Sequence, residues 1–178
     1  MSSSQSPFPP VRRVVTGHTS AGKSTVIADS ALPARFWTPE SVNPVYEVHY
    51  TGESPAVIDS EISTGKWTDE ITLHLNLVSP GGSTFRCWEF EPGAVSPKHR
   101  TITVDYGIVA KGSVILELDD GEKVTLNEGD TIVQRGTMHT WRNASQTEWA
   151  KMHFVMLGAK PVEINGEQLT EVFRKADE

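Results

Sequence analysis

The feature that most limits what this chain can fold into is a close series of short strand-like segments from residue 84 onward. Most of these segments end at a glycine-containing turn, such as Asp119–Gly121, because glycine accepts the positive φ that a tight hairpin needs. Short strands at regular turn spacing are typical of a β-sandwich or a barrel. The expected strands in this part of the chain are 84–91, 104–110, 113–118, 122–126, 131–134, 138–143 and 148–157.

The earlier part of the chain adds fewer and less regular strands. These are expected at 11–18, 24–29, 43–50 and 71–78, with a long polar loop at 51–70. The one helix that the sequence predicts is 168–176, where Leu169, Val172 and Phe173 recur at helical spacing. The predicted organisation is a disordered tail at 1–10, strands and a loop packing on the barrel at 11–70, the barrel itself at 71–160 and a C-terminal extension at 161–178.

Composition excludes several classes of function. The formal net charge of −7 disfavours a nucleic-acid partner, because cationic side chains are what neutralise the phosphates of a strand. No stretch approaches the roughly 18 apolar residues of a membrane-spanning helix, and residues 1–10 lack the basic and apolar parts of a secretory signal. Cys87 is the single cysteine, so no internal disulfide can form, and the expected location is the cytoplasm.

The segment 17–24, GHTSAGKS, matches the phosphate-binding Walker A pattern letter for letter. That motif needs a helix directly after it, whose N-terminal amides hold the phosphates. The residues that follow are rich in β-branched side chains, and Pro33 ends them before a helix of useful length can form. We therefore expect a hairpin turn at this place and no bound nucleotide.

A histidine, a carboxylate and two glycines recur at a characteristic spacing between residues 93 and 112. Gly93, His99 and Gly112 are in register with the first motif of the cupin family, G-x5-H-x-H-x3-4-E-x6-G, which this segment resembles. Asp105 stands at the glutamate position of that motif, and Thr101 stands where its second histidine would be. The segment therefore keeps one histidine and one carboxylate of the family pattern.

A second histidine segment follows at the separation that the family shows. Gly129, Gly136, His139 and Asn143 resemble the second cupin motif, G-x5-P-x-G-x2-H-x3-N, with a first gap one residue short and Gln134 in place of proline. Two motifs in this order are a far more specific signal than either one alone. The resemblance covers about residues 72–158 and implies an all-β cupin jelly-roll barrel, extended by the N-terminal hairpin and the short C-terminal helix.

The resemblance also implies that both motifs place their side chains inside the barrel near its mouth. His99, Asp105 and His139 would then converge there, and two histidines with one carboxylate can hold a divalent metal such as Fe, Zn, Mn or Ni. Thr101 is a poor metal ligand, and aspartate is one methylene shorter than glutamate. The same three residues also suit catalysis without a metal. His99 or His139 would then be the general base, Asp105 would orient it, and Tyr106 would be the acid.

Other residues of the expected barrel strands are candidates for binding a small molecule. They alternate with apolar residues, so one face of each strand points into the barrel. His153 lines the cavity only if its mixed face points inward. The candidate substrate-binding residues are Arg86, Trp88, Thr101, Trp141 and His153.

Residues 99–143 closely resemble a subgroup of small single-domain cupins with HRT-x3-DYG and QRGT-x-H-x-WRN motifs. Such proteins occur in bacteria and in fungal secondary-metabolite pathways, and cupins of this size usually form homodimers. The wider superfamily includes lyases, isomerases, dioxygenases and binding proteins, so the fold does not fix the function.

Three functions remain open on the sequence. The leading hypothesis is a lyase or isomerase that decarboxylates, dehydrates or isomerises an aromatic or polyketide-like metabolite by His/Asp acid–base chemistry. Five tryptophans are available to line an apolar pocket for it. The alternatives are an iron-dependent dioxygenase and a ligand-binding cupin without turnover.

Overall fold

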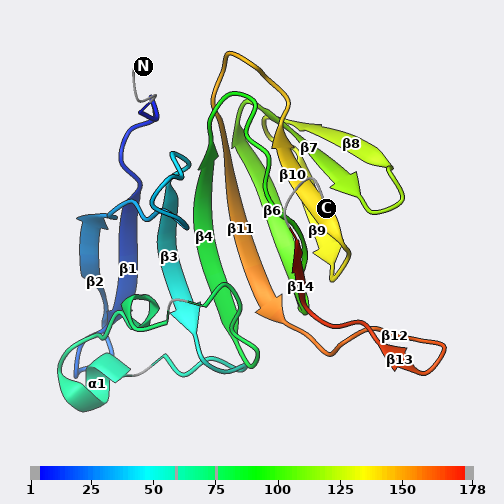
Figure 1. Cartoon of the computed structure of the whole chain (residues 1–178). Helices are drawn as coiled ribbons and strands as arrows, with labels where there is room; N and C mark the ends of the chain where they lie inside the picture. The colour runs from blue at the N-terminus through cyan, green and yellow to red at the C-terminus, as the bar shows by residue number, and fades with distance from the viewer. Residues whose placement is uncertain (1–4, 59, 75, 175–178) are drawn as a thin grey trace.

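The structure, a computed structural model, describes residues 5–58, 60–74 and 76–174. It is an all-β barrel made of two five-stranded sheets that face each other (Figure 1). The first sheet has the order β3 (Val45–Thr51), β4 (Ser83–Phe90), β11 (Ala150–Gly158), β6 (Thr103–Lys111) and β9 (Thr131–Arg135). The second has the order β14 (Val172–Arg174), β5 (Lys98–Arg100), β10 (His139–Asn143), β7 (Ser113–Leu118) and β8 (Lys123–Asn127). This architecture confirms the predicted jelly-roll barrel.

The core lies between the two sheets because successive side chains of a strand point to opposite faces. In β11, Met152, Phe154 and Met156 are buried, while the residues between them are only partly buried. Val114 and Trp141 of the second sheet complete the same apolar cluster from the other side. The alternation in the sequence therefore sets which residues can reach the inside of the barrel.

The N-terminal hairpin consists of β1 (Arg12–His18) and β2 (Ser24–Ala31) and lies beside β3 (Figure 1). The Thr19 amide donates a hydrogen bond to the Lys23 carbonyl at 2.8 Å, and Gly22 has a φ of 73°. The Walker-A-like segment is therefore the turn of a hairpin with a strand after it, as predicted. Within the hairpin region, Arg13 donates to the Val48 carbonyl at 3.1 Å and so ties β1 to β3.

The predicted C-terminal helix at 168–176 is wrong over the residues that the structure describes. These residues contain the end of β13 (Glu167–Gln168), which forms a small hairpin with β12 (Glu163–Ile164), and the whole of β14. A short isolated helix is marginal in water, whereas β5 offers an open edge with which β14 pairs. Residues 175 and 176 lie outside the described part.

The predicted strand at 71–78 is also wrong over the part that the structure describes, residues 71–74 and 76–78. A single-turn 3₁₀ helix, η1 (Glu70–Thr72), occupies its start, and a five-residue helix, α1 (Ser60–Thr64), interrupts the loop before it. The Asn76 and Leu77 carbonyls accept hydrogen bonds from the Arg86 side chain, the former at 2.6 Å. Because these carbonyls are satisfied by a side chain, they need no partner strand.

Two further features bear on the predicted organisation. β3 pairs with β4 along its length, so a strand from the predicted 11–70 region belongs to the barrel sheet itself. Among the described residues, no helix is long and apolar enough to cross a membrane. The predicted disorder of residues 1–10 stays a prediction, and residues 1–4 lie outside the described part.

The outer face of the first sheet, which runs from β3 at one edge to β9 at the other, carries exposed apolar side chains. Tyr106, Ile108 and Val133 are among the exposed large hydrophobic residues, and Tyr106 pairs with Val133 in the ladder between β6 and β9. The homodimer implied by the family resemblance stays a prediction. Light scattering on the purified full chain measures it directly.

Candidate active site

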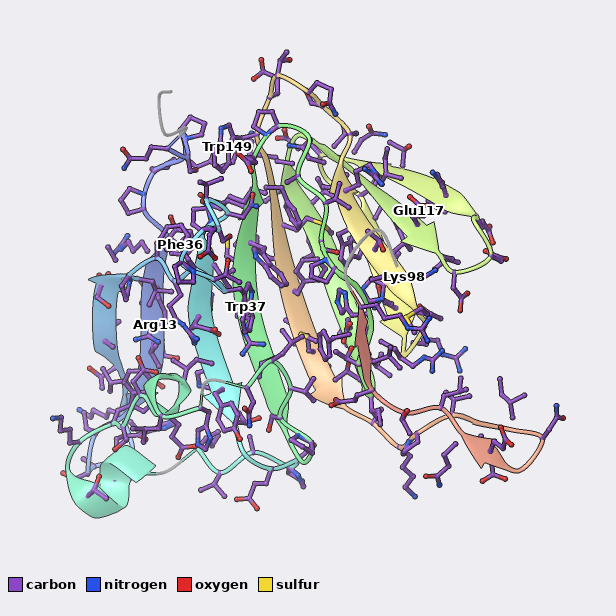
Figure 2. The ribbon with its side chains drawn as sticks, viewed as in Figure 1. Arg13, Phe36, Trp37, Lys98, Glu117 and Trp149 are labelled. Atoms are coloured by element: carbon purple, nitrogen blue, oxygen red, sulfur yellow. The ribbon has the colours of Figure 1, made fainter. Side chains whose placement is uncertain are left out.

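The barrel holds an apolar cavity of about 370 Å³ at its open end. Aromatic rings dominate its walls: Trp37 packs on Trp88 with 5.9 Å between ring centroids, and Trp141, also in the wall, packs on the core residue Phe154 at 5.5 Å. Figure 2 shows Trp37 over β4. Apolar walls with a few polar groups are the usual form of a small-molecule site. The lining residues are Trp37, Thr38, Ser41, Asn43, Leu77, Trp88, Phe90, Ala94, Val95, Ser96, Pro97, His99, Trp141 and Phe173.

His99 is the one titratable side chain among these lining residues. It lies on β5, directly opposite His139 on β10, and the two ring centroids are 4.2 Å apart. Its Nδ1 lies 2.8 Å from the Pro97 carbonyl oxygen, which can only accept a hydrogen bond. The proton is therefore assigned to Nδ1, and Nε2 is left as the basic nitrogen. Burial lowers the pKa of His99 below its ordinary value, so the neutral form is favoured at pH 7.

His139 lies deeper than His99 and does not line the cavity. Strand alternation puts His139, Trp141 and Asn143 on the inner face of β10. Its Nδ1 is 2.9 Å from the Thr137 carbonyl oxygen, which again assigns the proton to Nδ1. Burial, with a smaller contribution from His99, lowers the pKa of His139 to about 3.

Gln134 connects His139 to Asp105. Asp105 on β6 and Gln134 on β9 are register partners, and both are buried. The Gln134 amide nitrogen lies 3.3 Å from Asp105 Oδ2 and 3.1 Å from His139 Nε2, so it can donate one proton to each. Asp105 Oδ1 and Gln134 Oε1 are buried without a hydrogen-bond partner. The Asp105 carboxylate therefore supports His139 through an amide and not by direct contact.

The Asp105→Asn substitution is expected to stabilise the protein at neutral pH. Burial is the main reason that the pKa of Asp105 rises from 3.8 to about 6. Because the folded pKa exceeds the unfolded one, the carboxyl contributes stability below about pH 4, and this contribution is lost as the pH rises through 6. Asparagine can still accept from Gln134, so the gain above pH 6 should be about 2–3 kcal/mol and should vanish near pH 4. Urea unfolding followed by tryptophan fluorescence at pH 4, 5, 6 and 7.5 measures it. A gain equal at all four pH values would contradict the prediction.

His139 should have the opposite effect on the pH dependence of stability. Its folded pKa lies below the ordinary value of 6.5, so its contribution is complete above pH 6.5 and is lost as the pH falls. The loss should approach about 1.4 kcal/mol per pH unit below that point. His139→Asn keeps a donor for the Thr137 carbonyl and should flatten this slope between pH 6.5 and 4.5. The same unfolding series on wild type and variant tests it, and parallel stability curves would show that His139 does not titrate as stated.

The three residues predicted as metal ligands do not form a ligand set in this arrangement. Among the described residues, no group of three or more His, Cys, Asp or Glu side chains could hold a metal ion. The Gln134 amide stands between Asp105 and His139, and the Thr101 hydroxyl is bonded to that of Thr103 at 2.7 Å. No step of the chemistry below passes through a metal, and the metal itself stays a prediction.

Trp88 and Trp141 line the cavity as substrate-binding candidates should, whereas Arg86 points inward but is 1% exposed and is not among the lining residues. Its Nε contacts Glu47 Oε2 at 2.5 Å, and its two terminal nitrogens donate to the Asn76 and Leu77 carbonyls. Arg86 therefore fastens the 76–77 loop to the sheet and is not available to bind an anionic group.

The structure does not bring three other candidates to the cavity. Tyr106 follows the inward Asp105 in β6 and so points outward, with 48% of its surface exposed. His153 lies on the outer face of β11, where it packs on Phe85 with 5.9 Å between ring centroids. Thr101 is buried and does not line the cavity. Tyr106 therefore cannot donate a proton inside this barrel.

Three residues that the sequence analysis did not single out for the site are central to it. In the sequence Gln134 is only a departure from the family motif, and its pairing with Asp105 joins β6 to β9, two strands that are not consecutive in the chain. Trp37 lies before the barrel motifs, and no local pattern points to it. Phe173 was assigned to a helix face, yet it pairs with His99 in the β14–β5 ladder.

Two inward histidines beside a partly open apolar cavity give this jelly-roll barrel the usual form of a small-molecule site. The cupin-domain family model matches residues 86–158. "Oryzines biosynthesis cluster protein J" of Aspergillus oryzae is 36% identical over 165 residues, which cover 92% of each chain. "Cupin-domain-containing oxidoreductase srdB" of Neurospora crassa is 31% identical over 157 residues, 88% of this chain and 78% of the relative.

A solved structure agrees with the fold. The Cnp3 cupin domain of Schizosaccharomyces pombe matches 82% of this chain and 86% of its own with a TM-score of 0.50, at 8% sequence identity. Identity this low concerns the fold alone. The cupin-domain match and the sequence relatives show that the chain belongs to the cupin family.

Proposed function

We propose that this cupin is a lyase or isomerase that moves a proton on a neutral aromatic metabolite, with His99 as the base. The observation that carries the proposal is the position of His99. It alone among the lining residues can titrate, and its Nδ1 proton is held by the Pro97 carbonyl. A neutral imidazole with a free Nε2 can abstract a proton from a bound ligand. As the imidazolium it can then return the proton at another atom of the ligand, in an isomerisation, or to the ligand's leaving hydroxyl group, which departs as water in a dehydration.

The charges around the cavity favour a neutral ligand. Among the residues that the structure describes, no Asp, Glu, Lys or Arg side chain lines it, and each nitrogen of the nearby Arg86 guanidinium already donates one hydrogen bond. A carboxylate brought into this cavity would lose its hydration without gaining a cationic partner. This favours isomerisation or dehydration over decarboxylation among the reactions open on the sequence.

The relatives support the metabolic setting. Oryzines biosynthesis cluster protein J is by its name part of a biosynthetic cluster, and we place this chain in a comparable secondary-metabolite pathway. In that setting a ligand with fused or substituted aromatic rings matches the five aromatic side chains along the cavity wall, which are Trp37, Trp88, Phe90, Trp141 and Phe173.

The experiment is deuterium exchange at an acidic C–H next to a carbonyl. 2-Tetralone is a neutral bicyclic aromatic ketone of suitable shape, and its C1 protons can be followed by NMR in D₂O. We expect the wild-type protein to accelerate this exchange at least about 100-fold over buffer, the lower range for a positioned general base. Tight binding without acceleration would instead support a ligand-binding cupin without turnover.

The second candidate is a metal-dependent dioxygenase. The name of the Neurospora crassa relative, a cupin-domain-containing oxidoreductase, favours it. Metal analysis of protein purified without a histidine tag, together with oxygen uptake in the presence of aromatic ligands, distinguishes it. Stoichiometric iron with oxygen consumption would replace the acid–base proposal.

A further inference from the structure

Phe173 lies against His99 at the mouth of the cavity. It is directly opposite His99 in the ladder between β14 and β5, so both side chains lie on the same face of the sheet. The two rings are stacked with an interplanar angle of 6° and 5.6 Å between centroids. His99 is 7% exposed and Phe173 is 58% exposed. Phe173 therefore covers the imidazole from the solvent side while remaining open to solvent itself.

The strand that carries Phe173 is attached to the barrel by few contacts. β14 pairs with three residues of β5 and is the edge strand of its sheet (Figure 1). Between the end of β11 and β14, the β12–β13 hairpin pairs with itself. The Ala159 amide donates to the Ile102 carbonyl at 3.1 Å, and Arg100 reaches the Thr170 carbonyl at 3.5 Å. An edge strand held this lightly can unpair while the core remains folded.

The cavity that Phe173 closes has a definite chemical character. Its wall combines Phe173 with Trp37, Trp88 and Trp141, and its polar lining groups carry no charge other than that available to His99. Planar rings stack favourably on such walls. A ligand with a net negative charge would have no cationic partner among the lining residues.

We propose that Phe173 is a specificity-determining residue: β14 unpairs from β5 to admit a flat, uncharged aromatic ligand, and the Phe173 ring closes over it beside His99. This rests on the proposed function for the identity of the site and names the class of ligand that the site accepts. Phe173 acts by shape and stacking and takes no part in moving the proton.

The first test needs no ligand. Diethyl pyrocarbonate modifies neutral imidazoles, and peptide mass spectrometry measures the rate at each histidine separately. Phe173→Ala should raise the rate at His99 about tenfold and leave the exposed His18 unchanged. Ile164→Ala, an exposed apolar residue on β12 of the same C-terminal segment, is the matched control and should change neither rate. An unchanged rate at His99 in Phe173→Ala overturns the proposal.

The second test measures ligand class by titration calorimetry with 2-tetralone and with the anion 2-naphthoate. Wild type should bind 2-tetralone at least about tenfold more tightly than 2-naphthoate. Phe173→Ala should weaken 2-tetralone binding about 3–10-fold, the range for one aromatic stack, and Phe173→Tyr should restore it. Equal binding of the two probes, or of 2-tetralone to wild type and Phe173→Ala, overturns the proposal.

The two proposals can fail separately. If the protein catalyses deuterium exchange but ligand binding does not depend on Phe173, the specificity role is removed and His99 remains the base. Binding that depends on Phe173 without any exchange would keep the specificity role and remove the reaction.

Discussion

Replacing His99 by glutamine is expected to abolish the protein-dependent part of 2-tetralone exchange, a loss of at least about 100-fold. Glutamine can still donate to the Pro97 carbonyl but has no basic nitrogen to receive a proton. Because His99 alone among the cavity-lining residues can titrate, no other lining residue can take its place. NMR in D₂O measures the exchange rate, and calorimetry on the same variant should show that 2-tetralone still binds.

His139→Gln is the matched comparison for His99→Gln. His139 lies 4.2 Å from His99 between ring centroids but does not line the cavity. Its loss should lower the exchange rate less, about tenfold at most, if it supports His99 and does not touch the ligand. A larger loss for His139→Gln than for His99→Gln would reverse the roles assigned to the two imidazoles.

The roles of these residues depend on a geometry that the sequence predicts only in part. The sequence alone predicts that the two histidine segments meet in the fold, because both match motifs at the right separation. The structure places His99 opposite His139. Strand alternation also predicts which side chains point into the barrel, beyond the residues that the motifs name. Once Asp105 is taken as inward, its neighbour Tyr106 must point outward, and the apolar residues flanking His153 put that histidine on the outer face.

The remaining parts of the site could not be predicted from local patterns. Trp37 and Trp88 are far apart in sequence, and their contact forms only when the chain folds. Phe173 lies in a segment too short for the helical and extended patterns to be distinguished. It is a strand because β5 presents a free edge, and that edge exists only after the barrel has formed. Tertiary pairing therefore decides the local structure at the mouth of the site.

Arg86 shows how a residue chosen for ligand binding can instead hold the cavity in shape. Its side chain is 1% exposed, and it connects Glu47 on β3 to the carbonyls of the 76–77 loop. Glu47 also contacts Arg35 at 3.1 Å. Both Leu77 of that loop and Trp37 line the cavity. The Trp37 ring lies 5.9 Å from the Arg86 guanidinium. The buried ion pair therefore sets the position of two walls at once.

Arg86→Met is expected to lower the free energy of unfolding by about 3–5 kcal/mol, because it leaves the Glu47 carboxylate buried with one partner fewer. Urea unfolding followed by tryptophan fluorescence measures it at pH 7.5. The double variant Arg86→Met with Glu47→Gln removes the carboxylate that has lost one of its two arginine partners and should recover more than half of the loss, as seen when both members of a buried pair are replaced. A loss below about 1 kcal/mol in the single variant, or no recovery in the double variant, would show that the Arg86–Glu47 pair does not hold the wall. Calorimetry with 2-tetralone completes the argument. If the pair positions Trp37 and Leu77, the double variant should regain stability without regaining full affinity, because the hydrogen bonds to the 76–77 loop remain absent.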